Sequence, residues 1–379
     1  MLTWRSIYNG YKDWGYPEAS SAEWASYYLT GEFGTNPYNV SQPVGTDGKM
    51  NPDAKLLYSE DWRKALFASR LRQEYTMDFS GKSKKADYYI SGGYLNDKGV
   101  FSIQKFERFS TRVNLNYEVN KWLKVGTNVS LSHSTREGSA GSSTVWFLRT
   151  MPTIYSIYKR DASTGAYTLD KDGNRIFDYG DYRTAWSGWN PLADDAYNKY
   201  PWMHDDVSSR TYAEITFLPG LKWRTNLSVD YYQYTYDGYS SSEYGYSAGY
   251  KGEASKESDR NFSYTINNLL TYEKSFGDHS FSFLVGQEGY ALKYKYLYAS
   301  KQGLPFPGVT EIGSAAVMTS MNSYEDNYRL LSWLSRMEYN YKDRYYLSGS
   351  FRTDGSSRFH PDNRWGKFWS FGGSCLQVH

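Results

Sequence analysis

The residues best suited to catalysis or metal binding are few and scattered in this sequence. The single cysteine, Cys375, can form no internal disulfide and no cysteine-rich metal site. Neither a GxSxG nucleophile elbow nor a GxxxxGK[ST] phosphate loop is present. No two histidines have a metal-ligand spacing such as HExxH; they are His133, His204, His279, His360 and His379. We therefore expect no enzyme, no metal site and no cofactor.

Two acidic segments match cation-binding loops only in part. His204-Asp205-Asp206 could bind a cation, although a solvated loop is the simpler interpretation. The segment from Asp170 to Asn174 begins like a calcium loop, but Arg175 stands where that loop needs glycine, and Asp181 where it needs glutamate. Both segments are predicted to be polar loops.

Aromatic side chains are the better candidates for ligand contact. The chain contains 40 Tyr, 18 Phe and 13 Trp, and four tryptophans fall in one long stretch without strand periodicity. An exposed indole or phenol ring offers a large, rigid surface on which a sugar or peptide can stack. The alternative is that these rings pack the loop against itself or join an interfacial aromatic girdle. The predicted ligand-binding residues are Trp146, Trp186, Trp189 and Trp202.

Composition excludes several classes of protein. The 379 residues include 43 Lys plus Arg against 41 Asp plus Glu, a net charge of +2 that gives no basic footprint for nucleic acid. The mean hydropathy is −0.73, and no apolar run is long enough for a transmembrane helix. A transmembrane β-barrel stays open, because its strands alternate apolar and polar residues. The segment after Met1 lacks the charged and apolar regions of a signal peptide.

A strict period of two marks the elements that must position these aromatic residues. From Phe109 to Val119, and again from Leu123 to Leu131, the odd positions are mostly apolar and the even positions polar. This pattern predicts two strands, each with one apolar and one polar face. The three-residue turn Asn120–Trp122 keeps both apolar sets on one face, so the two strands are predicted to form a hairpin.

The same arrangement recurs along the chain, and its connections alternate in length. Short turns are predicted near 81–85, 120–122, 218–220, 277–278 and 342–344. Long excursions are predicted at roughly 133–210, 232–260 and 288–328. Strands of about 9 to 11 residues, with short turns on one side and long loops on the other, are typical of outer-membrane barrels. About ten strands fit, with another beginning at Trp369–Phe371. The predicted fold is all-β, an antiparallel meander forming about half of a large transmembrane barrel.

The first 74 residues differ from the rest. Ser20–Leu29 and Asp61–Arg70 are predicted to be short helices with Ser and Asp caps, separated by loop rich in Gly and Pro. We therefore predict an early barrel and loop region at 1–74 and a partial barrel at 75–379.

Several long segments resemble the SusC/RagA class of TonB-linked outer-membrane proteins. Asp61-Trp62 is also similar to the start of that family's barrel. The segments are Asp87–Ser132, Leu218–Tyr232 and Tyr339–Ser374. The resemblance implies a barrel of about 22 strands filled by a plug, in the outer membrane of a gram-negative bacterium. It also implies import of oligosaccharides or peptides, energised by the TonB complex, with a SusD-like surface lipoprotein as partner.

The sequence departs from that family pattern in two respects. It carries no plug domain or TonB-contacting box, and it ends at Gln377-Val378-His379 without an aromatic terminal strand. We therefore expect a sheet that does not close, with the odd residues of 109–131, including Val113, Leu115, Val125 and Val129, on its convex, lipid-facing side. Lumen-facing charges such as Arg224 and Glu214 are expected on the other side. We expect the chain expressed alone to aggregate or be degraded, because lipid does not tolerate unpaired strand edges.

An alternative function is a secreted or surface all-β polysaccharide-binding protein without transport activity. Such a sandwich would bury the apolar faces of 109–131 against a second sheet. A barrel would instead present a continuous apolar band, about 25 Å tall, to lipid.

Overall fold

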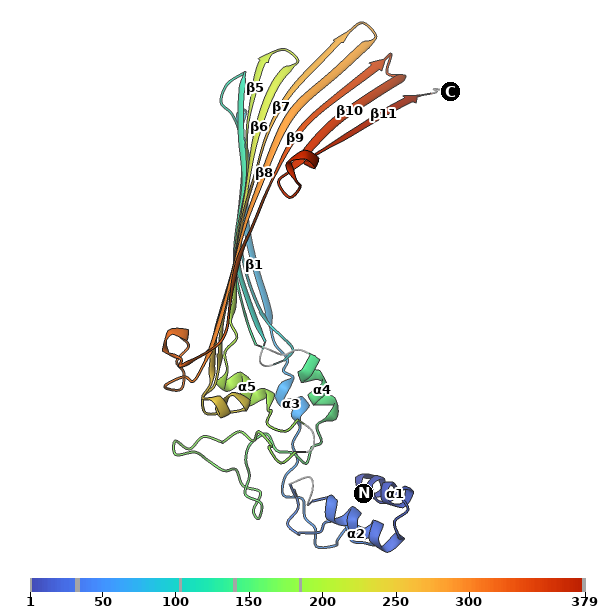
Figure 1. Ribbon diagram of the computed structural model, residues 1–379, viewed down its shortest axis with the longest axis vertical. Coiled ribbons are helices and arrows are strands. Elements are labelled where there is room, and N and C mark those ends of the chain that lie inside the picture. The colour runs from blue at the N-terminus through green and yellow to red at the C-terminus, as the bar shows by residue number, and fades with distance from the viewer. Residues whose placement is uncertain (1, 31–34, 102–103, 139–141, 184–185, 377–379) are drawn as a thin grey trace.

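The computed structural model describes residues 2–30, 35–101, 104–138, 142–183 and 186–376. Within them, eleven antiparallel strands form one sheet in strand order, the predicted meander (Figure 1). The first six are β1 (Arg72–Lys82), β2 (Ala86–Lys98), β3 (Lys105–Glu118), β4 (Leu123–Glu137), β5 (Trp202–Leu218) and β6 (Leu221–Ser240). The others are β7 (Glu253–Phe276), β8 (His279–Gln302), β9 (Val317–Tyr341), β10 (Tyr345–Ser356) and β11 (Trp365–Cys375).

The sheet is open, as expected. Each strand pairs with its neighbours in the chain, and β1 and β11 lie at the two edges. All five short turns lie where the alternation predicts them, from 83–85 between β1 and β2 to 342–344 between β9 and β10. The β3–β4 register places Val113 opposite Val129 and Tyr117 opposite Val125, so the apolar sets share one face.

The long excursions are shorter than predicted, because the strands extend far into them. β6 to β9 contain 20 to 25 residues each, rather than about 9 to 11. The connections are therefore 138–201, 241–252 and 303–316. The outer parts of these strands carry polar side chains on both faces, so the alternation of apolar and polar residues that reveals a strand disappears there.

Within the described ranges five α-helices lie outside the sheet, and the sequence predicts only two of them. They are α1 (Leu2–Asp13), α2 (Glu18–Tyr28), α3 (Trp62–Leu66), α4 (Ser142–Thr150) and α5 (Pro191–Tyr197). The Asp61 cap is confirmed, because its carboxylate accepts from the Lys64 amide at 3.0 Å. The Ser20 cap is wrong: α2 begins at Glu18 after Pro17, and Ser21 is buried inside the helix.

The two faces of the sheet have opposite character. On one face, large apolar side chains from successive strands are exposed, including Phe79, Leu115, Leu227, Ile266, Met337 and Phe351. On the other, polar side chains interact across strands: Arg224 lies 3.7 Å from Glu214 and 3.9 Å from the Tyr212 ring centre. Gly126 leaves room for that ring, which a Cβ would meet at 2.3 Å.

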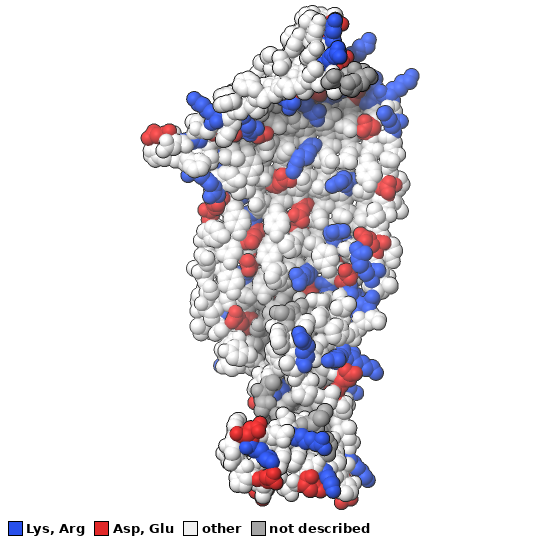
Figure 2. All heavy atoms as spheres, turned by 90° about the vertical axis from the view of Figure 1, so that its right-hand side faces the viewer, with Lys and Arg blue, Asp and Glu red and all other residues white. Residues whose placement is uncertain are grey.

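The polar face lies on the inside of the curve. In Figure 1 the sheet bends toward the right, and Figure 2 views the molecule from that side. Charged side chains are spread along the length of the face shown there. The apolar set of 109–131 therefore belongs to the opposite, convex face, as the alternation predicts. None of the helices in the described ranges has the length and apolar character needed to cross a membrane. Residues 377–379, the predicted non-aromatic end, lie outside the described residues.

Candidate functional site

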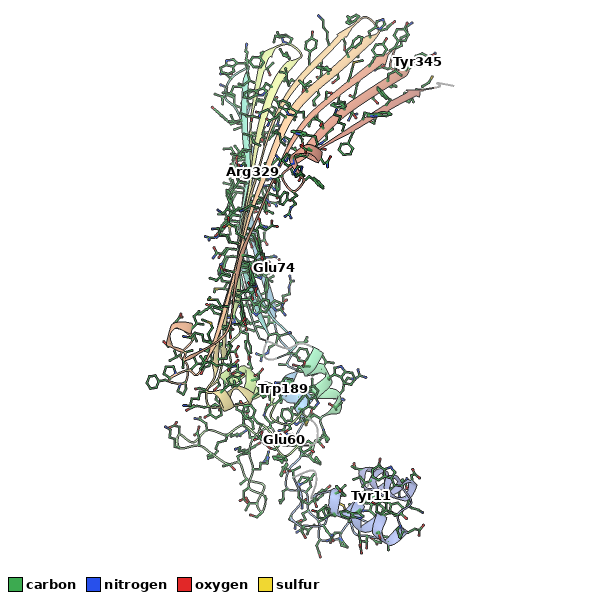
Figure 3. The ribbon with its side chains drawn as sticks, viewed as in Figure 1. Tyr11, Glu60, Glu74, Trp189, Arg329 and Tyr345 are labelled. Carbon is green, nitrogen blue, oxygen red and sulfur yellow. The ribbon has the colours of Figure 1, made fainter. Side chains whose placement is uncertain are left out.

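The long connections gather at one end of the sheet, which we call the loop end. It consists of residues 35–71, 142–201, 241–252 and 303–316. In Figure 3, Glu60 and Trp189 lie at this end, whereas Tyr345 lies at the opposite end beside a short turn. Segments far apart in the chain therefore meet here on the same side of the sheet.

An apolar cluster holds the loop end together. Trp62 and Leu66 of α3 pack against Phe147 and Leu148 of α4 and against Ile157. The Trp62 indole donates a hydrogen bond to the Tyr155 carbonyl at 2.9 Å, and its ring meets Phe147 edge-on at 4.8 Å. The cluster thus joins α3 to the β4–β5 connection, although about 90 residues separate them in the chain.

Two of the four predicted tryptophans pack against this cluster. Trp186 and Trp189 are half-buried, with ring centres 5.2 Å apart, and both rings contact Phe147. The Trp186 indole also donates to the Thr150 hydroxyl at 2.7 Å. These contacts favour loop packing for both residues and leave only part of each ring for a ligand.

The other two tryptophans lie in different surroundings. Trp146 of α4 is 57% exposed, with the Arg149 guanidinium 5.3 Å from its ring centre. Trp202 is the first residue of β5 rather than part of a loop, and its ring contacts Tyr234 and Tyr236 of β6. The structure therefore brings three of the predicted residues together around α4 and places the fourth on the sheet.

A cavity of about 750 Å³ lies beside the cluster, between three connections of the loop end. Its volume falls within the usual range for small-molecule sites. Five aromatic residues line it, none of them among the predicted tryptophans: Tyr58, Phe177, Tyr179, Tyr182 and Tyr244. Polar groups such as Asn36, Lys159 and Glu243 complete the lining. The signal for this site in the sequence is weak, because its aromatic residues are dispersed over three connections.

Arg160 fixes one wall of the cavity. Its guanidinium donates to Glu60 at 2.7 Å, to the Ser156 hydroxyl at 2.9 Å and to the Gly165 carbonyl at 2.8 Å. The same group lies 3.9 Å from the Tyr167 ring centre and 4.9 Å from that of Tyr58. Because Glu60 already neutralises this cation, Arg160 acts as a support and offers no free charge to an anionic ligand.

Asp178 organises the opposite wall. It is buried and accepts from the Tyr182 hydroxyl at 2.5 Å and from the Gly180 amide at 2.8 Å. Desolvation and then this hydrogen bond raise the pKa of Tyr182, and desolvation followed by the charge of Asp194 raises that of Tyr179. Both phenols therefore stay protonated, so the wall presents neutral rings with hydroxyl groups.

The two acidic segments that resemble cation-binding loops in the sequence form no metal site in the described residues. Among the described residues, no group of His, Cys, Asp or Glu is arranged to hold a metal ion. His204 and Asp205 lie on β5, with Asp205 2.6 Å from His133 of β4, so this segment is strand and not loop. Asp170 accepts from the Asn174 amide at 2.8 Å within a tight turn, as expected of a polar turn.

Comparison with known proteins gives a consistent assignment. No family model matches the chain. TonB-dependent receptor P3 of Formosa agariphila is 28% identical over 319 residues, which cover 81% of this chain and 30% of the relative. TonB-dependent receptor SusC of Bacteroides thetaiotaomicron is 26% identical over 321 residues, 81% of this chain and 31% of the relative. The solved RagAB peptide transporter matches 83% of this chain and 35% of its own with a TM-score of 0.68 and 25% identity.

An open meander with an apolar convex face, a polar concave face and long loops at one end is part of a TonB-dependent receptor barrel. TonB-dependent receptors lie in the outer membrane of gram-negative bacteria and belong to a class of transporters, not enzymes. Within that class, the chain is a barrel portion of the SusC/RagA type and spans about 30% of the curated relatives' length. No second sheet covers the first in the described ranges, as a polysaccharide-binding sandwich would require.

Proposed function

We propose that the chain forms part of the wall and the outer vestibule of an importer for oligosaccharides or peptides. The observation that carries this proposal is the loop-end cavity, lined by neutral phenol rings and placed at the end of the barrel where the long connections gather. Import of this kind uses energy relayed by the TonB complex, through the plug of the full-length parent protein. A SusD-like lipoprotein covers the vestibule. The similarity to a solved peptide transporter supports the peptide class.

Uptake by the full-length parent, in cells with and without TonB, tests this function. We expect TonB-dependent accumulation of at least one probe class from a panel of fluorescent neutral oligosaccharides and a labelled casein digest. A second pair of strains, with and without the cognate lipoprotein, tests the partner. A parent receptor that reaches the outer membrane and accumulates neither class in a TonB-dependent way contradicts the proposal.

A matched pair of variants tests the cavity itself. Tyr244 lines the cavity and stacks on Tyr197 at 3.9 Å, whereas Tyr246 in the same connection is 88% exposed and does not line it. We expect Tyr244→Ala to weaken uptake several-fold and Tyr246→Ala to leave it unchanged. Equal effects of the two substitutions contradict a ligand role for the cavity.

A further inference from the structure

The outer part of the concave face carries a second arrangement of aromatic rings, separate from the loop-end cavity. We call it the acid–tyrosine patch; it consists of Tyr234 and Tyr236 of β6, Glu257 and Asp259 of β7, and Tyr296 and Tyr298 of β8. In the sheet register, Asp259 pairs with Tyr234 on one side and Tyr296 on the other. Glu257 likewise pairs with Tyr236 and Tyr298. Each carboxylate therefore lies between two phenol rings on neighbouring strands.

The patch lies beyond the part of the wall that crosses the membrane. β6 starts at Leu221 beside a short turn, and strands cross the bilayer in about 9 to 11 residues. Tyr234 and Tyr236 follow that segment, and the register carries their β7 and β8 partners to the same height. The patch therefore borders the water-filled vestibule through which a ligand passes.

Further rings extend the patch on both sides. On β5, His204 lies 5.0 Å from the Tyr234 ring centre, and Trp202 lies 5.3 Å from that of Tyr236. On β9, Tyr324 lies 5.2 Å from Tyr296 and is 53% exposed. An aromatic surface thus spans five strands, with two carboxylates at its centre.

No cation neutralises these two carboxylates. Among the described residues, neither Glu257 nor Asp259 forms an ion pair, and the residues that pair with them on β6, β8 and β9 include no Lys or Arg. The nearby bases occupy alternate positions, which point to the opposite face. There they are paired: Lys256 with Asp237 at 3.1 Å and Lys295 with Glu325 at 2.8 Å. On β7 and β8 near the patch, the bases therefore lie on the convex side and these two carboxylates on the concave side.

One polar atom in the patch lacks a partner although it is shielded from water, while a hydrogen bond joins the same carboxylate to Tyr294. The Oδ1 atom of Asp259 is buried and accepts no hydrogen bond from the described residues. Burial, followed by the charge of Asp259, raises the pKa of Glu257. A shielded, unpaired acceptor is costly, so this arrangement favours a donor supplied by a bound molecule.

A carboxylate between aromatic faces matches the chemistry of an organic cation. The carboxylate pairs with an ammonium or guanidinium group, and the rings attract the same charge through their negative faces. We propose that the acid–tyrosine patch binds the lysine or arginine side chains of an imported peptide and so selects basic peptides. This inference rests on the proposed import function, and it assigns the specificity of the vestibule to named residues.

The test compares two peptides that differ only in charge. The probes are a fluorescent pentapeptide with a central lysine and its norleucine counterpart, offered to the full-length parent with its lipoprotein. We expect the wild-type receptor to take up the lysine peptide about tenfold better, which corresponds to about 1.4 kcal/mol. The Glu257→Gln, Asp259→Asn double variant should reduce that preference to less than about twofold, with uptake of the norleucine peptide unchanged.

A matched control separates this effect from a general change of charge. Asp230 lies on the same face but is already paired with Arg210 at 3.0 Å, so Asp230→Asn should keep the preference for lysine. A wild-type receptor without the preference, or a double variant that retains it, overturns the proposal. Equilibrium binding of both peptides to purified receptor in detergent gives the same comparison without transport. If the receptor imports neither peptide but the purified receptor binds the lysine peptide more tightly, the result contradicts the import function and supports the patch.

Discussion

The membrane-spanning part of the wall and the loop end place their apolar residues in opposite ways. Near the short turns, Met77, Phe79 and Leu347 are about 60% exposed, and no apolar residue of that region is fully buried. At the loop end, Trp62, Leu66 and Phe147 are 3% exposed or less. The hydrophobic effect therefore orients apolar side chains differently in the two regions. The wall turns them outward to lipid, and the loop end buries them as a water-soluble domain does.

Ion pairs show the same contrast. Arg160 and Glu60 of the loop end are 14% and 11% exposed, and the pair is reinforced by hydrogen bonds to neighbouring backbone and side chains. On the wall, Arg210 and Asp230 are 49% and 46% exposed and face the lumen. An exposed pair contributes little to stability, whereas breaking a buried one leaves a charge without a partner. The loop end should therefore respond strongly to single substitutions, and the wall should respond according to which face is changed.

The largest effect is expected from Trp62→Ala in the full-length receptor. The change removes a buried indole from the centre of the cluster and leaves the Tyr155 carbonyl without its donor. Phe or Trp to Ala substitutions in cores cost about 3–5 kcal/mol. We expect the loop end to become sensitive to protease while the barrel keeps its resistance to heat in detergent. Trp14→Ala, at a residue that is 75% exposed, is the control and should change little. Equal protease sensitivity of the two variants contradicts a core at the loop end.

A smaller effect is expected from Val113→Arg on the wall. Val113 pairs with Val129 and Ile90 on the convex face, and an arginine there would have to enter lipid. Such a substitution costs about 2–4 kcal/mol near the bilayer midplane. Its neighbour Asn114 lies on the concave face, so Asn114→Arg should cost much less. Folding into lipid vesicles at graded urea concentrations compares the two variants, and the reverse order would show that the faces have been assigned the wrong way round.

A several-fold effect on uptake is expected from Trp146→Ala. The exposed ring of Trp146 is free for stacking, which is worth about 1–3 kcal/mol for a base on an aromatic side chain and a similar or smaller amount for a sugar. Trp189→Ala should instead loosen the cluster against which that ring packs. Uptake and protease resistance are measured on both variants. If Trp146→Ala imports at the parental rate, the predicted stacking role of this residue is wrong.

The sequence predicts the wall far better than the loop end, for a physical reason. In the membrane-spanning part, each strand has lipid on one side and water on the other, so Phe109–Val119 alternates and its register follows directly. The outer parts of β6 to β9 have water on both sides, so their alternation is lost and they are predicted as loop. Tyr234 and Asp259 fall in this part, which is why their pairing across strands emerges only from the structure.

The loop end depends on contacts between distant segments. The pairing of Trp62 with Phe147 joins residues of α3 and α4, and no local pattern in either helix identifies the other as its partner. Helices of 5 to 9 residues such as α3, α4 and α5 also give too few turns for a helical period to be recognised. Trp146, Trp186 and Trp189 lie in the connection between β4 and β5 and Trp202 begins β5, and the surroundings of all four follow from tertiary packing that could not be predicted.

The smallest expected effect is a pH dependence confined to the loop end. Desolvation, followed by the charges of Asp194 and Glu137, raises the pKa of Asp195 from an ordinary value of 3.8 to about 6. Folding of this region therefore takes up a proton between those two values. The carboxyl costs nothing below about pH 4, becomes destabilising as the pH rises from about 4 to 6, and has its full cost above 6. Because the residue is solvent-accessible, screening should keep the cost below about 1 kcal/mol. Asp161 titrates in a lower pH range, since hydrogen bonds from Ser163 and Thr164 lower its pKa to about 2.

We expect Asp195→Asn to slow proteolysis of the loop end at pH 7 and to have no effect at pH 4. A stabilisation of equal size at both pH values would mean that the substitution acts through packing and not through the charge.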